Sequence, residues 1–320
     1  MNFFNRCKHI VLVSVLCVST VFSMPVQART KSSKSSAQKA AEQAAAAALQ
    51  AEVDARYNKE IESNSWENWP AGPQVYAESA IVMEASTGTI LYAKGIDEQH
   101  YPASITKIMT VLLALENCQM DEEVTFSHNA VYSIDYGSSS IARDEGEVLT
   151  VEECLYAIML ESANECANAI AEHISGSTEE FANLMNQRAA ELGCTNTHFA
   201  TPNGLDFGYD HYTTASDLAK IARYAIKRNM FRTLISTGYY SFSNLNTGRT
   251  YYIGTTNALL GNLPGVQGMK TGYTNKAGYC FVGLSYSQKG NTYISVVLGG
   301  SSSASRWEDS RRLLTYAYYH

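Results

Sequence analysis

The chain has 320 residues, of which 45% are hydrophobic and 17% are charged, which is the composition of a globular protein with one large or two modest cores. The formal charge of −7 and the lack of a basic stripe in the expected folded region argue against nucleic acid as a partner. The basic stretch at residues 29–39 is interpreted as a solvated linker, and peripheral contact of this N-terminal segment with an anionic wall or membrane surface remains open.

Residues 1–28 have the pattern of a signal peptide. A polar segment at residues 6–9 precedes an apolar, uncharged run at residues 10–22, and Ala28 ends a small-residue cleavage pattern. The apolar run is short for a membrane span, so an uncleaved anchor is the less favoured alternative. In both cases we expect an exported, extracytoplasmic protein.

The cysteines beyond residue 28 are odd in number, so at least one thiol is expected to stay unpaired within the chain. Neither Cys-x-x-Cys nor His-Glu-x-x-His occurs, and the spacings suit neither a zinc site nor a small disulfide scaffold. We therefore predict no metal, no cofactor and mostly buried thiols. The cysteines concerned are Cys118, Cys154, Cys166, Cys194 and Cys280.

The segment that follows the signal sequence is low in complexity. Residues 30–61 are first rich in Ser and Lys and then rich in Ala, which predicts a helix with too little apolar surface to build a core. Residues 70–73 contain two prolines and a glycine that mark a boundary. We interpret residues 29–74 as a stalk or linker and residues 75–320 as the folded domain.

In the folded domain, strands and helices follow one another with clear turn and cap signals. The expected strands are residues 80–84, 89–94, 239–253 (a hairpin), 278–287 and 292–298; the expected helices are residues 104–115, those after the capping-box sequences at 150–153 and 177–180, 214–228 and 305–319. Strands at both ends with helices between them predict an α/β (α+β) fold. Its antiparallel sheet is built from both chain ends and flanked by helices, with a helical insert.

The sequence Ser104-Ile105-Thr106-Lys107 pairs a hydroxyl with an amine. Positions i and i+3 of a helix lie on one face, so the amine can reach the hydroxyl. A serine needs such a base to act as a nucleophile, and lysine can serve if burial and a second cation, here Lys270, lower its pKa. A second Ser-x-x-Lys at residues 36–39 lies in the polar tail and is interpreted as a chance match.

Two further motifs complete an ordered trio. Ser162-Ala163-Asn164 stands between two expected helices, where Ser162 could relay a proton and Asn164 could donate to substrate and to Lys107; a plain inter-helix turn is the alternative. The similar Ser127-His128-Asn129 follows a polar strand and is not favoured. In Lys270-Thr271-Gly272 the lysine supplies positive field, Thr271 offers a hydroxyl to a carboxylate, and Gly272 lets a substrate backbone approach an edge strand.

Backbone N–H groups of Ser104 and Tyr273 are candidates for an oxyanion hole.

The trio resembles the penicillin-recognising serine transferases of β-lactamase/transpeptidase-like fold. More narrowly, it is similar to the low-molecular-mass D-alanyl-D-alanine carboxypeptidases, which are penicillin-binding proteins of the bacterial cell wall. The resemblance covers residues 76–320 and includes residues 101–104, 201–205, 211–215 and 270–278. It also implies that Arg306, in the last helix, binds the terminal carboxylate of the substrate. Where the family usually carries Gly-Asn-Asp-Ala, this chain has Ala163-Asn164-Glu165-Cys166.

The resemblance implies an acyl-enzyme reaction on peptidoglycan. Ser104 would attack the penultimate D-alanine of a stem pentapeptide while Lys107 takes its proton, and Ser162 would protonate the departing D-alanine. Water would then hydrolyse the acyl-enzyme, and β-lactams would acylate Ser104 as slowly released inhibitors.

Alternative functions are a D,D-endopeptidase, a class A β-lactamase and an inactive wall-binding module. A β-lactamase needs a glutamate that activates the deacylating water, and we expect no Glu-x-x-x-Asn between Ser162 and Lys270, where Glu191 leads to Thr195. An inactive module is expected to have lost a motif residue, whereas all are present. The endopeptidase is poorly separated by sequence.

Overall fold

The computed structural model describes residues 35–208 and 210–320. The predicted signal peptide lies outside the described residues. Residues 47–320 form one compact unit, and the described residues before them, 35–46, belong to a separate unit. Within the described part, none of the helices has the length and apolar character needed to cross a membrane.

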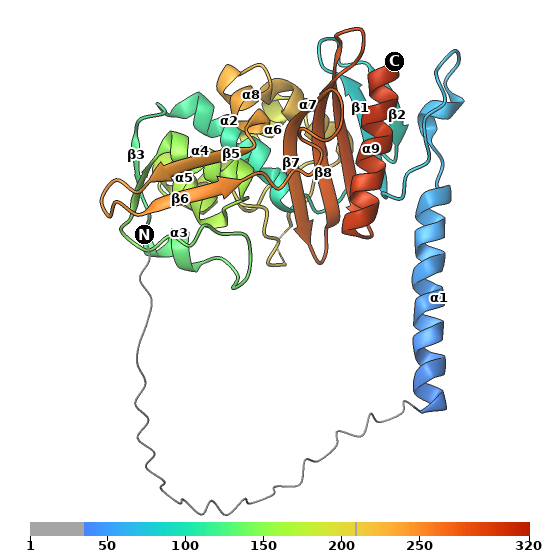
Figure 1. Cartoon of the computed structure of the whole chain (residues 1–320), viewed down its shortest axis with the longest axis horizontal. Helices are drawn as coiled ribbons and strands as arrows, with labels where there is room; N and C mark the ends of the chain where they lie inside the picture. Colours follow the sequence, from blue (N-terminus) through green and yellow to red (C-terminus); the bar gives the residue numbers. More distant parts are fainter. Residues whose placement is uncertain (1–34, 209) are drawn as a thin grey trace, which may run out of the picture. The chain divides into compact units, whose positions relative to one another are not determined.

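A five-stranded antiparallel sheet in the order β2-β1-β9-β8-β7 forms the centre of the second unit (Figure 1). Its strands are β1 (Ser79–Glu84), β2 (Ile90–Lys94), β7 (Val266–Thr274), β8 (Gly278–Tyr286) and β9 (Thr292–Gly300). β1 pairs with β9, so the N-terminal hairpin and the C-terminal strands form one sheet. The predicted fold class, a sheet built from both chain ends, is confirmed.

Both faces of the sheet are covered, because the inner strands are apolar on alternate sides. On β1, Ile81 belongs to the main core beneath the helices, whereas Val82 packs with Leu313 of α9 (Ser303–Tyr319). The helix α9 lies along β8 and β9 on one face, and α7 (Ala215–Ala225) packs on β1 and β9 (Figure 1). A sheet sandwiched in this way has little freedom to shift its register.

The helical insert follows the two N-terminal strands. It contains α2 (Lys107–Asn117), α3 (His128–Tyr132), α4 (Val151–Leu160), α5 (Asn164–Ser175), α6 (Thr178–Glu191), α8 (Asn229–Ser236), the short strands β3 (Glu123–Thr125) and β4 (Val148–Thr150), and the hairpin β5 (Tyr239–Ser243) and β6 (Thr250–Gly254). The predicted capping box at Thr150 and Glu153 starts α4. Ser177 and Thr214 cap α6 and α7, but at α6 only the Ser177 half of the predicted capping box forms. These starts were predictable because caps are local.

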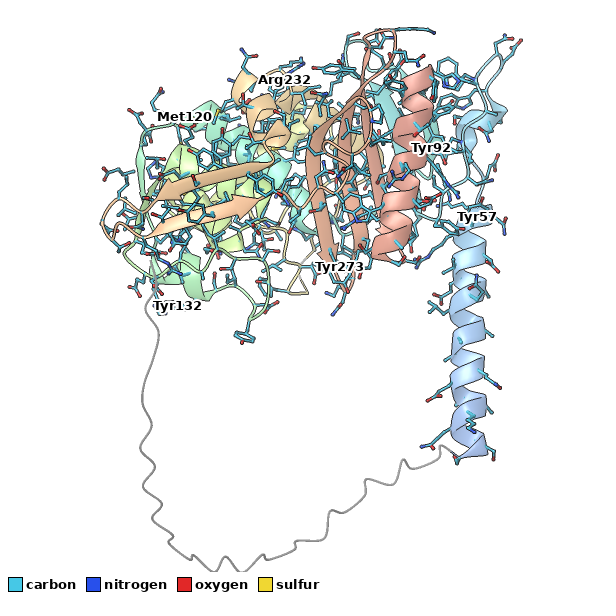
Figure 2. All side chains as sticks on the ribbon, viewed as in Figure 1. Tyr57, Tyr92, Met120, Tyr132, Arg232 and Tyr273 are labelled. Atoms are coloured by element: carbon cyan, nitrogen blue, oxygen red, sulfur yellow. The ribbon has the colours of Figure 1, made fainter. Side chains whose placement is uncertain are left out.

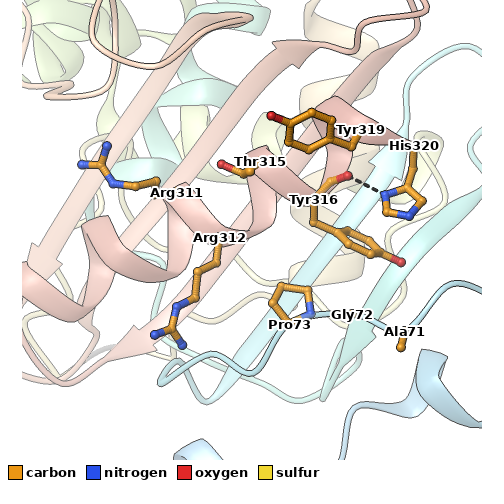
Figure 3. Close-up of a pocket in the computed structure, with 9 residues that line it drawn as sticks. All are labelled: Ala71, Gly72, Pro73, Arg311, Arg312, Thr315, Tyr316, Tyr319 and His320. Carbon is orange, nitrogen blue, oxygen red and sulfur yellow. Dashed lines mark hydrogen bonds between the residues drawn. The ribbon is translucent and has the colours of Figure 1, made fainter.

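The low-complexity segment forms α1 (Ser36–Asn58), as predicted, and no residue of this helix is buried. The chain then contacts the sheet before residue 75. Ile61 is buried, and the buried hydroxyl of Ser63 in the 3-10 helix η1 (Glu62–Ser65) accepts a hydrogen bond from the N–H of Ala93. Further on, residues 71–73 and the end of α9 enclose a cavity of about 470 Å³ (Figure 3).

A buried carboxylate joins the start of the domain to its last helix. Asp309 of α9 accepts hydrogen bonds from the backbone N–H groups of Tyr76 (2.9 Å) and Ala77 (2.8 Å). Burial raises the pKa of Asp309 to about 6, against the opposing effect of these N–H groups and of Lys94. The contact holds α9 in a fixed position on the sheet.

Candidate active site

A cavity of about 220 Å³ lies between the sheet edge β7 and the helical insert. It is lined by Ser104, Gly137, Ser138, Ser139, Ser162, Asn164, Leu205, Thr256, Thr271, Gly272, Tyr273 and Arg306. Seven of the nine predicted site residues are therefore in one cavity. The other two, Lys107 and Lys270, are buried beside it.

The hydroxyl and the amine of the first motif are in contact. Ser104 lies in a 3-10 turn, η2 (Ala103–Thr106), and Lys107 begins α2 directly after it. Nζ of Lys107 is 3.0 Å from Oγ of Ser104. A 3-10 turn aligns positions i and i+3 even better than an α-helix does, so the expected shared face is confirmed although the first turn is not α-helical.

The other partners of Lys107 direct its lone pair. Nζ donates to Oδ1 of Asn164 (2.7 Å) and to the backbone oxygen of Asn203 (2.5 Å). Both oxygens can only accept, so a neutral amine uses its two N–H groups on them and is left with a lone pair towards Ser104. The expectation that Asn164 donates to Lys107 is therefore wrong, because the amide oxygen faces the amine.

The surroundings of Lys107 favour its neutral form. Lys107 has no exposed surface, and burial, followed by the positive charge of Lys270, holds its pKa well below the ordinary value for lysine. Burial and then the guanidinium of Arg306 lower the pKa of Lys270 itself to about 7. The proximity of the second cation, predicted from sequence, is confirmed.

Two glycines allow η2 to fit tightly between neighbouring chain segments. A Cβ on Gly204, whose φ is +86°, would lie 2.0 Å from the backbone oxygen of Ala103. A Cβ on Gly272 would lie 3.2 Å from the backbone nitrogen of Ser104, so β7 passes close to the turn that carries Ser104. The backbone that lies close to Gly272 is that of η2, and the predicted approach of a substrate backbone to this glycine stays a prediction.

Three side chains in the cavity have polar atoms without partners among the described residues. These are the hydroxyls of Ser138 and Ser162 and Nε of Arg306, all of them buried. Ser162 also has a φ of +63°, a strained conformation for a serine. Buried polar atoms are normally hydrogen-bonded, so their concentration in one cavity indicates a place where a polar ligand completes the bonds.

The β7 motif presents its residues to the cavity from the sheet edge. Lys270 is buried, and its Nζ donates to the backbone oxygen of Thr271 (3.2 Å), whose hydroxyl is paired with that of Thr256 (2.8 Å). Tyr273 is half exposed and lies at the end of the sheet (Figure 2). From α9, Nη1 of Arg306 donates to the backbone oxygen of Gly272 (3.5 Å).

Several residues of the site had no signal in the sequence. The loop at residues 137–141 lines the cavity and is held by the buried carboxylate of Glu165, which accepts from Oγ of Ser140 (2.8 Å) and N–H of Ile141 (2.7 Å). The carbonyl of Asn203 and the hydroxyl of Thr256 were missed as well, because each acts through a tertiary contact.

The competing sequence matches lie elsewhere. Ser127 caps α3 by accepting from the N–H of Ala130, and Ser36 is exposed at the start of α1. A Glu-x-x-x-Asn spacing does exist at Glu179 and Asn183, contrary to the expectation for this stretch, but both residues lie on α6 and neither lines the cavity of Ser104. Among the described residues, the hydrogen-bond partners of Nζ of Lys107 are a hydroxyl, an amide oxygen and a backbone oxygen, and none of them is a carboxylate.

The thiols agree with the prediction. Cys154, Cys166, Cys194 and Cys280 are buried and free, and Cys118 is partly buried. None of them lines the cavity of Ser104.

Comparison with known proteins agrees with the geometry. The model of the D-alanyl-D-alanine carboxypeptidase family matches residues 66–302. The chain is 39% identical over 248 residues to D-alanyl-D-alanine carboxypeptidase DacF of Bacillus subtilis (strain 168), covering 76% of this chain and 62% of that protein. It is 34% identical over 259 residues to a D-alanyl-D-alanine carboxypeptidase of Streptomyces sp. (strain K15), covering 77% and 88%. This chain thus spans less than two thirds of the Bacillus relative.

Solved structures show the same fold. The crystal structure of the Streptomyces K15 DD-transpeptidase superposes with a TM-score of 0.73 at 34% identity, over 78% of this chain and 99% of that one. The D-alanyl-D-alanine carboxypeptidase DacD from Francisella tularensis gives a TM-score of 0.70 at 30% identity, over 77% and 71%. The resemblance inferred from the motifs is confirmed: the chain belongs to the D-alanyl-D-alanine carboxypeptidase family.

Proposed function

We propose that this protein is an exported serine D-alanyl-D-alanine carboxypeptidase that removes the terminal D-alanine of peptidoglycan stem pentapeptides through an acyl-enzyme on Ser104. The observation that carries the proposal is the buried, deprotonation-prone amine of Lys107, 3.0 Å from Oγ of Ser104. Membership of the family supports the substrate class.

Acylation uses the lone pair of Lys107. As Oγ of Ser104 attacks the carbonyl carbon of the penultimate D-alanine, its proton passes to Nζ, and the lysine becomes an ammonium held by Asn164 and Asn203. The backbone N–H groups of Ser104 and Tyr273 stabilise the negative charge that develops on the carbonyl oxygen. The close approach of β7 to η2 supports this pairing.

The leaving D-alanine needs a proton on its amine and residues that bind its carboxylate. Ser162 has a buried hydroxyl with no partner in the described structure and passes a proton from Lys107 to the departing amine. Arg306, with Thr271, binds the terminal carboxylate, and buried Lys270 adds positive field. Water then hydrolyses the ester of Ser104 and restores the enzyme.

Covalent labelling tests the nucleophile. A fluorescent penicillin should label the full chain, because a β-lactam presents its amide carbonyl to the same hydroxyl, and Ser104→Ala should abolish labelling. Ser127→Ala is the matched control, since this serine belongs to a similar sequence motif but caps α3 and donates to Glu172 away from the cavity of Ser104, and it should label normally. Labelling of a folded Ser104→Ala protein refutes the assignment.

The product distinguishes the possible acyl acceptors. Incubation with a stem pentapeptide should release one alanine, detected by mass. Transfer to an amine is the second candidate, because solved relatives at 34% identity are titled DD-transpeptidases; an added D-amino acid would then appear in the product. Cleavage of cross-linked dimers without loss of alanine from the pentapeptide would favour the endopeptidase and reject the carboxypeptidase.

A further inference from the structure

Three side chains of metal-ligating type, two from the loop after α2 and one from α5, meet on the surface of the helical insert. They are Cys118, Glu122 and His173, and their ligand atoms all lie within 4.8 Å of one another. Nε2 of His173 is 2.9 Å from Oε2 of Glu122. The loop that carries the first two includes Met120, which Figure 2 labels. No member of this group lines the cavity of Ser104.

The donor set suits one class of ion. A thiolate, an imidazole and a carboxylate are the ligands that zinc takes in proteins, commonly as three protein ligands with a fourth position for water. A thiolate and a carboxylate together supply two negative charges, which neutralise a divalent ion. Hard ions such as Ca²⁺ and Mg²⁺ prefer sets made of oxygen alone, so they are disfavoured here.

The backbone holds the ligands in place. Cys118 is the C-cap residue of α2 and donates its N–H to Ala114 (3.0 Å). A backbone hydrogen bond orients the carboxylate of Glu122: Oε1 accepts from the N–H of Gln119 (2.6 Å), which leaves Oε2 facing His173. Such outer contacts fix ligand geometry in metal sites and reduce the entropy lost on binding.

An ordinary surface ion pair does not account for the group. His128 and Glu145 make a comparable contact, with Nδ1 and Oε2 at 2.9 Å, but both side chains are more than half exposed. His173 and Glu122 are less exposed, at 26% and 39%. They also have a thiol within reach, and this thiol is the feature that distinguishes the group.

We propose that Cys118, Glu122 and His173 bind one zinc-type divalent cation. The ion would join the C-terminal ends of α2 and α5, whose N-terminal ends carry Lys107 and Asn164 of the active site. It would therefore fix the relative position of the two helices that hold the general base, at a distance from the reacting atoms and without taking part in the chemistry.

Cobalt titration of the reduced, metal-free full chain tests the proposal. Co²⁺ should give a thiolate-to-cobalt charge-transfer band that saturates at one ion per chain, and Zn²⁺ should displace it. Cys118→Ser should abolish the band, and His173→Gln should weaken Zn²⁺ affinity by at least about tenfold. His128→Gln, at the comparable pair without a thiol, should change neither result.

A second readout does not depend on any variant. Zn²⁺ should protect Cys118 from alkylation by iodoacetamide, measured by peptide mass, because a bound thiolate is no longer free to react. The proposal is overturned by a wild-type chain without the charge-transfer band, by a band that persists in Cys118→Ser, or by alkylation of Cys118 at the same rate with and without Zn²⁺.

Discussion

Asn164→Asp places a negative charge beside Lys107, the proposed general base, without changing the size of the side chain. In the native site Oδ1 of Asn164 is 2.7 Å from Nζ of Lys107. A unit charge at that distance interacts by roughly 6 kcal/mol at an effective dielectric constant of about 20, which corresponds to about four pKa units. The pKa of Lys107, which burial and Lys270 keep low, should therefore rise steeply.

The consequence is a change in the pH dependence of acylation. Only neutral Lys107 can accept the proton of Ser104, so the rate rises as pH passes through the pKa of the lysine and falls below it. In Asn164→Asp this rise should move to higher pH by several units, and penicillin acylation near neutral pH should slow by about three orders of magnitude or more. Stopped-flow labelling with a fluorescent penicillin between acid and alkaline pH measures both effects.

Asn164→Ala separates charge from the loss of contacts. It removes the same amide but adds no charge, so acylation should be slower at every pH. The pH at which the acylation rate rises should not shift to a higher value. If both variants show their rise at the same pH as the wild type, Lys107 does not act as the base through this contact.

Three further predictions follow from burial and close packing. Lys270→Met should abolish rapid acylation yet stabilise the fold. The native pKa of Lys270 is lowered from 10.5 to about 7, so the buried amine lowers the free energy of unfolding increasingly as pH falls from 10.5 to 7. Urea denaturation should therefore show that the variant gains at most roughly 5 kcal/mol in the free energy of unfolding at pH 6 and nothing above pH 10.5. Gly204→Ala should lower the free energy of unfolding by more than about 2 kcal/mol, because its Cβ would lie 2.0 Å from the backbone oxygen of Ala103. The control Gly193→Ala has a similar φ of +77° but no atom within 4 Å of the new Cβ, so it should lower the free energy of unfolding by only about 1 kcal/mol. Equal losses of stability in the two variants would contradict the packing argument. Glu165→Ala should slow acylation by at least about tenfold by releasing the loop it anchors, with Glu165→Gln restoring most of the rate because its amide oxygen still accepts; an unaltered rate in Glu165→Ala would show that the loop needs no such anchor.

The parts of the fold that were predictable are those with local signals. Turn and cap residues predict the hairpin of β1 and β2 and the helix starts at Thr150 and Thr214. Burial on both faces of the sheet explains why β8 and β9 are recognisable as apolar strands. The spacing of Ser104 and Lys107 also survives the change from an α-helical to a 3-10 turn. In each case the reason lies within a few residues of chain.

The residues that escaped prediction act through partners distant in sequence. The oxygen of Asn203 that binds Lys107 is a backbone atom 96 positions away, so its side-chain identity carries no information about this contact. Whether Asn164 donates to Lys107 or accepts from it depends on the other partners of Nζ, among them the oxygen of Asn203, so the direction of this hydrogen bond could not be predicted from the sequence. Likewise Cys118, Glu122 and His173 share no spacing that resembles a metal motif.

Arg306 and Asp309 occupy a single turn of α9, the last helix of the chain. Arg306 lines the cavity beside β7, and Asp309 accepts hydrogen bonds from two backbone N–H groups at the start of the domain. During synthesis Ser104 and Lys107 are made long before the turn of α9 that carries Arg306 and Asp309. A nascent or truncated polypeptide that lacks this turn has the proposed nucleophile but lacks both Arg306 in the cavity and the Asp309 contact, so we expect it to acylate only after α9 has been made.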